Sequence, residues 1–89
     1  MLERKLVRKI KDLGGMAIKL TSQYSKGDPD RLCLIFDETP FFVEVKSTGE
    51  KPTKIQLHVH EKIRELGFEV FIIDTTEKLK SLISRYEKG

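Results

Sequence analysis

The sequence predicts a small α/β fold in which helices lie on the faces of one layer of four strands. Three observations predict this class: apolar residues recur at the helical period in three segments, four short apolar runs alternate with them, and glycine or proline separates many of these segments. The length of 89 residues allows a single domain over residues 1–89 and excludes the large α/β enzymes, which need about 200 residues or more. A chain this short buries only about 60–65% of its unfolded surface, so a core shared with a second copy would add stability.

The first half of the chain predicts a helix followed by three strands. The apolar stripe of the helix ends before Gly14, and the next segment alternates, with Met16, Ile18 and Leu20 on its buried face. The apolar run around Cys33 does not alternate, which is typical of a strand covered on both faces. A short turn predicts a hairpin between this strand and the next. The expected bounds are a helix over 1–13, strands over 16–20, 32–36 and 41–46, and a polar loop over 21–29.

The second half predicts a helix, a strand and a final helix. The first of these helices is expected to open at Pro52 and Thr53 and to end at Leu66, before Gly67. Its apolar stripe consists of Ile55, Val59 and Ile63. A continuous apolar strand is expected over 70–73, and Asp74 with Glu77 resembles a capping box for the last helix.

Charge is unevenly distributed along the chain. The formal net charge is +3, but residues 1–26 carry +5, residues 27–50 carry −4 and residues 51–89 carry +2. An acidic centre between basic ends predicts a cation site with a polyanion at its rim. The alternative is that +3 is an ordinary charge for solubility.

Cysteine usage and hydropathy exclude several classes of protein. The single Cys33 excludes an internal disulfide framework and a cysteine zinc cluster, and it is expected to be buried as a small hydrophobic residue. No segment approaches the ~18 apolar residues of a membrane span, and the N-terminus lacks the apolar region of a signal peptide. We therefore expect a soluble cytoplasmic protein with no membrane partner.

The strand over 41–46 carries the strongest candidates for chemistry. Glu44 and Lys46 share one face of it, about 6.6 Å apart along the strand. A carboxylate can bind a hard cation, and a neighbouring ammonium can orient water or offset phosphate charge. In a hairpin, the start of strand 32–36 lies beside the end of strand 41–46, so Asp30 is expected near both side chains. The alternative is an edge strand with a solvated polar face.

Three further polar residues lie on the predicted helices. Glu3 projects within the apolar arc of the first helix, where a carboxylate is costly unless it is paired or bound to a metal. His58 and His60 do not share a helical face, and no cysteine or third histidine completes a zinc site with them. We expect His58 at the surface, whereas His60 lies one turn after Gln56 and could touch a substrate.

These residues resemble a known family. Gly-x-Pro-Asp at residues 27–30, a strand, Glu-x-Lys at residues 44–46 and an early helical Gln56 are similar to the PD-(D/E)xK nucleases, and more narrowly to the virus-type replication-repair nuclease (VRR-NUC) domain. The resemblance covers essentially the whole chain. It implies a restriction-endonuclease-like α/β fold of order α-β-β-β-α-β-α, with one mixed four-stranded sheet flanked by helices. Asp28 departs from the pattern, since many relatives have a small or apolar residue there.

The resemblance also implies a role for each residue. Asp30 and Glu44 would bind a divalent cation, normally Mg²⁺ with Mn²⁺ as a substitute. The main-chain carbonyl of Val45 would be a further ligand, and Glu3 would complete the metal shell. Lys46 would position or activate the attacking water, and Gln56 would orient water or a phosphate.

The function implied is a metal-dependent DNA endonuclease, because Mg²⁺ and a lysine can stabilise charge on a pentavalent phosphorus. Small stand-alone relatives act as homodimers on four-way junctions, and the resemblance is compatible with a phage or viral origin. Flaps or plain duplex are alternative substrates. A non-catalytic nucleic-acid-binding module and a structural α/β protein with a Glu–Lys surface pair are the rival hypotheses. Basic residues of the first helix could contact the DNA backbone together with Lys19, Lys26, Arg31, Lys51 and Lys54.

Overall fold

The computed structural model describes residues 1–21 and 27–87. Its elements follow the predicted order: α1 (Leu2–Asp12), β1 (Met16–Lys19), β2 (Arg31–Leu34), β3 (Phe41–Val45), α2 (Lys54–Glu65), β4 (Val70–Ile73) and α3 (Thr76–Tyr86). Most boundaries lie within one or two residues of those expected from the sequence. The expected loop over 21–29 lies partly outside the described residues, and the expected cation Lys26 lies wholly outside them.

The four strands form one mixed sheet with the order β1-β2-β3-β4. The pairs β1–β2 and β2–β3 are antiparallel, whereas β3 and β4 are parallel because α2 forms the crossover between them. The predicted fold class is thus confirmed. β3 lies between two strands, with Val43 opposite Arg31 on one side and Phe71 on the other, so the alternative of an edge strand is wrong.

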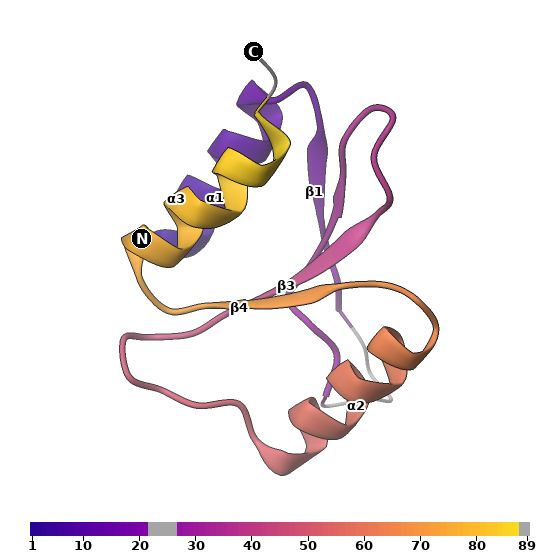
Figure 1. The fold of residues 1–89 in the computed structure, drawn as a ribbon. Helices are drawn as coiled ribbons and strands as arrows, with labels where there is room; N and C mark the ends of the chain where they lie inside the picture. Colours follow the sequence, from indigo (N-terminus) through magenta and orange to yellow (C-terminus); the bar gives the residue numbers. More distant parts are fainter. Residues whose placement is uncertain (22–26, 88–89) are drawn as a thin grey trace.

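The main core lies between the sheet and the pair of helices α1 and α3 (Figure 1). Phe41 anchors it, stacked on Tyr86 with ring centroids 4.6 Å apart. Cys33 is fully buried, as expected, and burial raises the pKa of its thiol to about 12. The other buried residues of this core are Leu6, Ile10, Ile35, Val43, Ile73, Leu79, Leu82 and Ile83.

The opposite face of the sheet carries α2 (Figure 1), which contacts β4. On β1 the predicted inward face is reversed: Met16 is 57% exposed and Ile18 is 38% exposed, whereas Ala17 packs against the core. The reason is the position of α1, which packs on the face of β1 that carries Ala17. Part of the sheet therefore presents apolar side chains to solvent.

The ends of α2 and α3 follow capping chemistry. Thr53 and Gln56 form a full capping box at the start of α2, and Gly67 follows its end with a positive φ of 95°. The predicted box of Asp74 and Glu77 is wrong, because Thr75 is the N-cap of α3 and accepts a hydrogen bond from the backbone of Lys78. None of the helices in the described part of the chain has the length and apolar character that a membrane span requires.

Candidate active site

Asp30 and Glu44 approach each other at one end of the sheet. Asp30 directly precedes β2, and its Oδ2 accepts a hydrogen bond of 2.7 Å from the backbone N–H of Val45. Val45 ends β3, one residue after Glu44. The antiparallel pairing of β2 with β3 therefore produces the neighbourhood that the hairpin predicted.

Glu44 is a buried carboxylate on the central strand, with 2% of its surface exposed. Its Oε2 lies 3.5 Å from Nζ of Lys46, whose side chain is only 12% exposed. Burial first, and then the charge of Asp30, raises the pKa of Glu44 to about 7, although Lys46 and Gln56 act in the opposite direction. A pair so deeply buried is not the solvated surface pair of the structural alternative.

Gln56 connects α2 to this carboxylate. Its Oε1 accepts from the backbone N–H of Thr53 at 2.9 Å, and its Nε2 donates to Oε2 of Glu44 at 3.1 Å. The capping box thus fixes the amide in the orientation that presents a donor to Glu44. The structure brings together four of the predicted site residues: Asp30, Glu44, Lys46 and Gln56.

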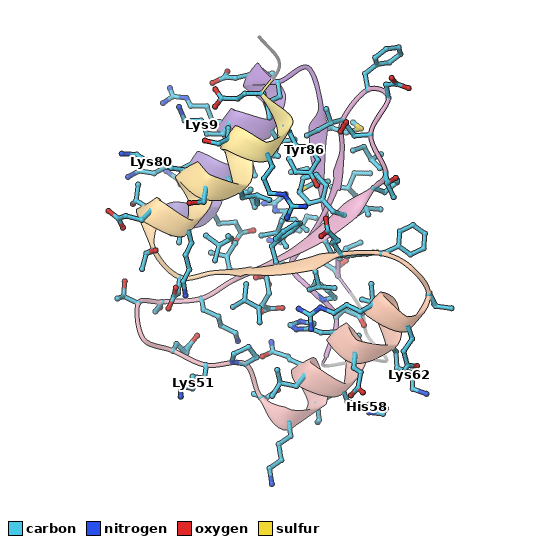
Figure 2. The ribbon with its side chains drawn as sticks, in the orientation of Figure 1. Lys9, Lys51, His58, Lys62, Lys80 and Tyr86 are labelled. Atoms are coloured by element: carbon cyan, nitrogen blue, oxygen red, sulfur yellow. The ribbon has the colours of Figure 1, made fainter. Side chains whose placement is uncertain are left out.

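His60 is the residue whose position differs most from expectation. It is fully buried, so it does not reach a substrate from the surface, and its Nε2 lies 3.6 Å from Oε1 of Glu44. Burial, followed by the charges of Arg64 and Lys46, lowers the pKa of His60, so the imidazole is neutral at neutral pH. His58 is exposed and points away from the sheet (Figure 2), as expected. The signal for His60 in the sequence is its spacing of four residues from Gln56, which places both side chains on one face of the helix.

The donor atoms at this site suit a hard divalent cation. Two carboxylates and the carbonyl of Val45 offer oxygen ligands, which Mg²⁺ and Mn²⁺ accept. Oε1 of Glu44 is buried without a hydrogen-bond partner among the described residues. Within residues 1–21 and 27–87, no three His, Cys, Asp or Glu side chains gather closely enough to enclose a metal ion. The remaining positions would belong to water and substrate, as is usual for Mg²⁺.

Comparison with known proteins decides the family. No protein-family profile matches the sequence. The "Putative nuclease p44" of Acyrthosiphon pisum secondary endosymbiont phage 1 is 38% identical over 76 residues, which cover 85% of this chain and 82% of that protein. A solved structure described as "VRR_NUC domain" is 31% identical and superposes with a TM-score of 0.88, covering 97% of this chain and 94% of that one. The chain belongs to the VRR-NUC nuclease family.

In this VRR-NUC chain, Glu3 does not join the carboxylate pair. Arg31 holds it, with Nε and a terminal nitrogen both 2.9 Å from Oε2 of Glu3. Arg31 also donates to the carbonyl oxygen of Ala17 at 3.1 Å. Glu3 is thus partnered as its inward direction requires, but none of the hydrogen bonds and ion pairs of the described residues joins it to Asp30 or Glu44.

The predicted cations of the VRR-NUC chain form two groups. Lys19 and Arg31 line a groove of about 410 Å³ with Arg4 and Arg8, beside the start of α1. Lys51 and Lys54 are exposed on the other side, where the chain enters α2, and Figure 2 shows Lys51 on the loop before that helix. Arg31 differs from the rest because its side chain is only 17% exposed and is engaged by Glu3.

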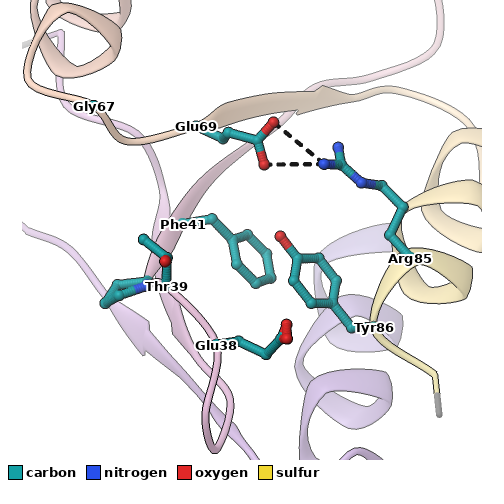
Figure 3. Close-up of a pocket in the computed structure, with 8 residues that line it drawn as sticks. Glu38, Thr39, Phe41, Gly67, Glu69, Arg85 and Tyr86 are labelled. Carbon is teal, nitrogen blue, oxygen red and sulfur yellow. Dashed lines mark hydrogen bonds and ion pairs between the residues drawn. The ribbon is translucent and has the colours of Figure 1, made fainter.

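A second pocket of about 410 Å³ lies at the other end of β3, beside Phe41 and Tyr86 (Figure 3). Arg85 spans part of it and donates to both carboxylate oxygens of Glu69 at 3.1 and 3.3 Å. Its lining shares no residue with the Asp30–Glu44 site, and Arg85 and Glu69 in it already pair with each other. The carboxylate site therefore stays the candidate active site of this VRR-NUC chain.

Proposed function

We propose that this chain is a single nuclease domain over residues 1–89 that hydrolyses phosphodiester bonds of DNA with Mg²⁺. The observation that carries the proposal is the meeting of Asp30, Glu44 and Lys46 at the end of the buried strand β3. Buried charged side chains are costly unless function or pairing keeps them. The family supports the same activity, since the similar phage protein and the similar structure are both named for nucleases.

Asp30, Glu44 and the carbonyl of Val45 are the residues that would hold the cation, and Mn²⁺ could replace Mg²⁺. When bound, the cation supplies Lewis-acid stabilisation of charge on the scissile phosphate. Lys46 orients the attacking water or offsets developing negative charge, since it is the cation next to Glu44. Gln56 holds Glu44 in place from α2. The water oxygen forms the new bond to phosphorus, and the bond to the leaving sugar oxygen breaks.

The cations on both sides of the site would bind the DNA backbone. Lys19 lines the groove beside α1, and Lys51 and Lys54 flank the start of α2. Phosphate contacts of this kind position the duplex without reading its sequence. Recognition by shape is therefore the mode that this surface favours, and we propose branched DNA, in particular the four-way junction, as the preferred substrate.

We further propose that the protein acts as a homodimer. One 89-residue chain has little surface for a branched substrate, whereas a symmetric pair offers two active sites for two strands. The exposed apolar face of β1, with Met16 and Ile18, is the surface of the sheet that a second copy would cover.

The decisive experiment is a cleavage assay on duplex, flap and four-way junction DNA with Mg²⁺, with Mn²⁺ and with chelator. We expect Glu44→Ala and Lys46→Ala to lose cleavage of the junction by a large factor while they still bind it, because each removes a group at the reacting phosphate. The matched control is Lys62→Ala, since Lys62 is an exposed cation on α2 away from the site.

The rival hypothesis, a non-catalytic binding module on the same fold, expects binding that weakens with salt and no cleavage with either metal. Undiminished cutting by Glu44→Ala or Lys46→Ala would refute the assigned site. Calorimetric titration with Mn²⁺ adds an independent check, since Asp30→Asn should bind the cation more weakly than the natural protein.

A further inference from the structure

His60 occupies the position that an apolar residue would normally take on a helix packed against a sheet. It is the one buried residue of α2, with no exposed surface, whereas Ile55 on the same helix is 56% exposed. Amphipathic helices usually bury their apolar stripe. The helix is instead rotated so that Gln56 and His60, one turn apart, both face β3. This orientation favours a polar contact over apolar burial.

The carboxylate of Glu44 is contacted differently on its two oxygens. Oε2 receives the hydrogen bond from Gln56 and lies beside Lys46. Oε1 lies 3.6 Å from Nε2 of His60. In the described part of the chain, Oε1 and both ring nitrogens of His60 are buried without a hydrogen bond. Three unsatisfied buried polar atoms in one place are costly, and such a cluster calls for a functional explanation.

The ring of His60 lies where it can donate a hydrogen bond from Nε2, since this nitrogen is 3.6 Å from Oε1 of Glu44. A neutral ring carries one N–H, and a carboxylate oxygen beside Nε2 favours the tautomer with the proton on that nitrogen. Catalytic hydrogen bonds are often long before ligands bind and shorten in the loaded site.

We propose that His60 is a positioning residue for the metal site: its Nε2–H holds Oε1 of Glu44 and fixes the orientation in which this carboxylate meets a divalent cation. Gln56 and His60 thus hold the two oxygens of Glu44 from successive turns of one helix. The inference rests on the proposed function, because it assigns Glu44 as a cation ligand. Hydrogen bonds to a ligating carboxylate generally affect metal affinity by 10–100-fold.

The test compares substitutions that keep or remove the donor. His60→Gln places an amide N–H near the position of Nε2, His60→Asn carries a shorter amide, and His60→Leu fills the space without a donor. Isothermal titration with Mn²⁺ and with Mg²⁺, on the full chain without DNA, measures affinity apart from activity. The control His58→Leu changes the exposed histidine of the same helix. Circular dichroism checks the fold of each variant.

We expect His60→Leu and His60→Asn to bind the cation ~10-fold more weakly, while His60→Gln and the control stay within about threefold of the natural protein. If His60→Leu does not fold, the difference in cation affinity between His60→Gln and His60→Asn serves as the test in its place. Equal affinity in all variants would overturn the role of His60 and leave the proposed function intact. A natural protein that binds neither cation would overturn the proposed metal site, and this inference with it.

Discussion

Glu44 is the residue on which the site depends, because it is an acid held almost without solvent on a central strand. Its position could be predicted from the sequence, since Glu44 and Lys46 share a strand face and the hairpin places Asp30 beside them. Its depth could not, because nothing in a local pattern shows that Gln56 and His60 of α2 would lie against Glu44. The packing of this helix turns a surface motif into a buried one.

Loss of the proton from Glu44 should make the metal-free protein less stable as the pH rises. The folded pKa of about 7 lies above the ordinary 4.5, so the stabilisation is full below pH 4.5 and is lost as the pH rises through 7. The free energy of unfolding should fall by up to about 3 kcal/mol across this range on account of Glu44. Urea unfolding followed by circular dichroism at successive pH values measures it.

Glu44→Gln should remove most of this slope, since an amide does not titrate. Glu61→Gln, on the exposed side of α2, should keep the slope. An identical pH dependence in Glu44→Gln and the natural protein would show that this carboxyl titrates normally.

Glu3 and His60 show which properties of single residues the sequence does not predict: the partner of Glu3 and the burial of His60. The inward direction of Glu3 was correct, but its partner Arg31 lies 28 positions away in sequence, and only the folded sheet brings them together. For His60 the spacing from Gln56 was visible. Its burial was not, because the apolar stripe of the helix suggested a different inward face.

At the scale of elements, the predicted inward face is wrong on β1 and shifted on α2, where Val59 and Ile63 are half-buried but Ile55 is exposed, for one reason. The apolar pattern of α2 and the alternation of β1 both predicted the inward face from hydrophobicity alone. On α2, Ile55 is exposed because Gln56 and His60 meet Glu44 instead. On β1, α1 covers Ala17 rather than Ile18. The order and type of the elements follow from the local sequence pattern, whereas the face that an element turns inward depends on the element packed against it.

Gly27 should be intolerant of a side chain, because it lies tightly against α2. A β-carbon there would come within 2.6 Å of Cγ2 of Val59 and 2.7 Å of the carbonyl oxygen of Ile55. Gly27→Ala should therefore lower the free energy of unfolding by about 1–3 kcal/mol, as overpacking does elsewhere. It should also weaken cation binding, because the displaced segment leads into Asp30. Urea denaturation and calorimetry give the two values.

The double variant Gly27→Ala with Val59→Ala tests the cause of that loss. It should recover part of the stability lost by Gly27→Ala, because the nearest colliding group, Cγ2 of Val59, is gone. Wild-type stability in Gly27→Ala alone would show that the segment moves aside without cost.

For the whole molecule, the uncovered sheet face predicts where the two copies of the proposed dimer meet. Ile18→Asp places a charge among the apolar side chains of β1, so the proposed dimer should dissociate and the solution mass should halve. The fold should persist, since Ile18 is not part of the buried core. Light scattering coupled to size exclusion measures the mass, and Leu57→Asp, at an exposed site on α2, is the control. A dimer that survives Ile18→Asp would place the interface elsewhere.

The parallel pairing of β3 with β4 also has a consequence during synthesis. A ribosome delivers Asp30, Glu44 and Lys46 first, Gln56 and His60 follow on α2, and β4, which contacts α2, comes after them. A nascent chain therefore carries its acidic ligands for some time without the helix that orients them. We expect the proposed DNA-cleaving activity to arise late, once Val70–Ile73 has joined the sheet, so that fragments released early do not cut DNA.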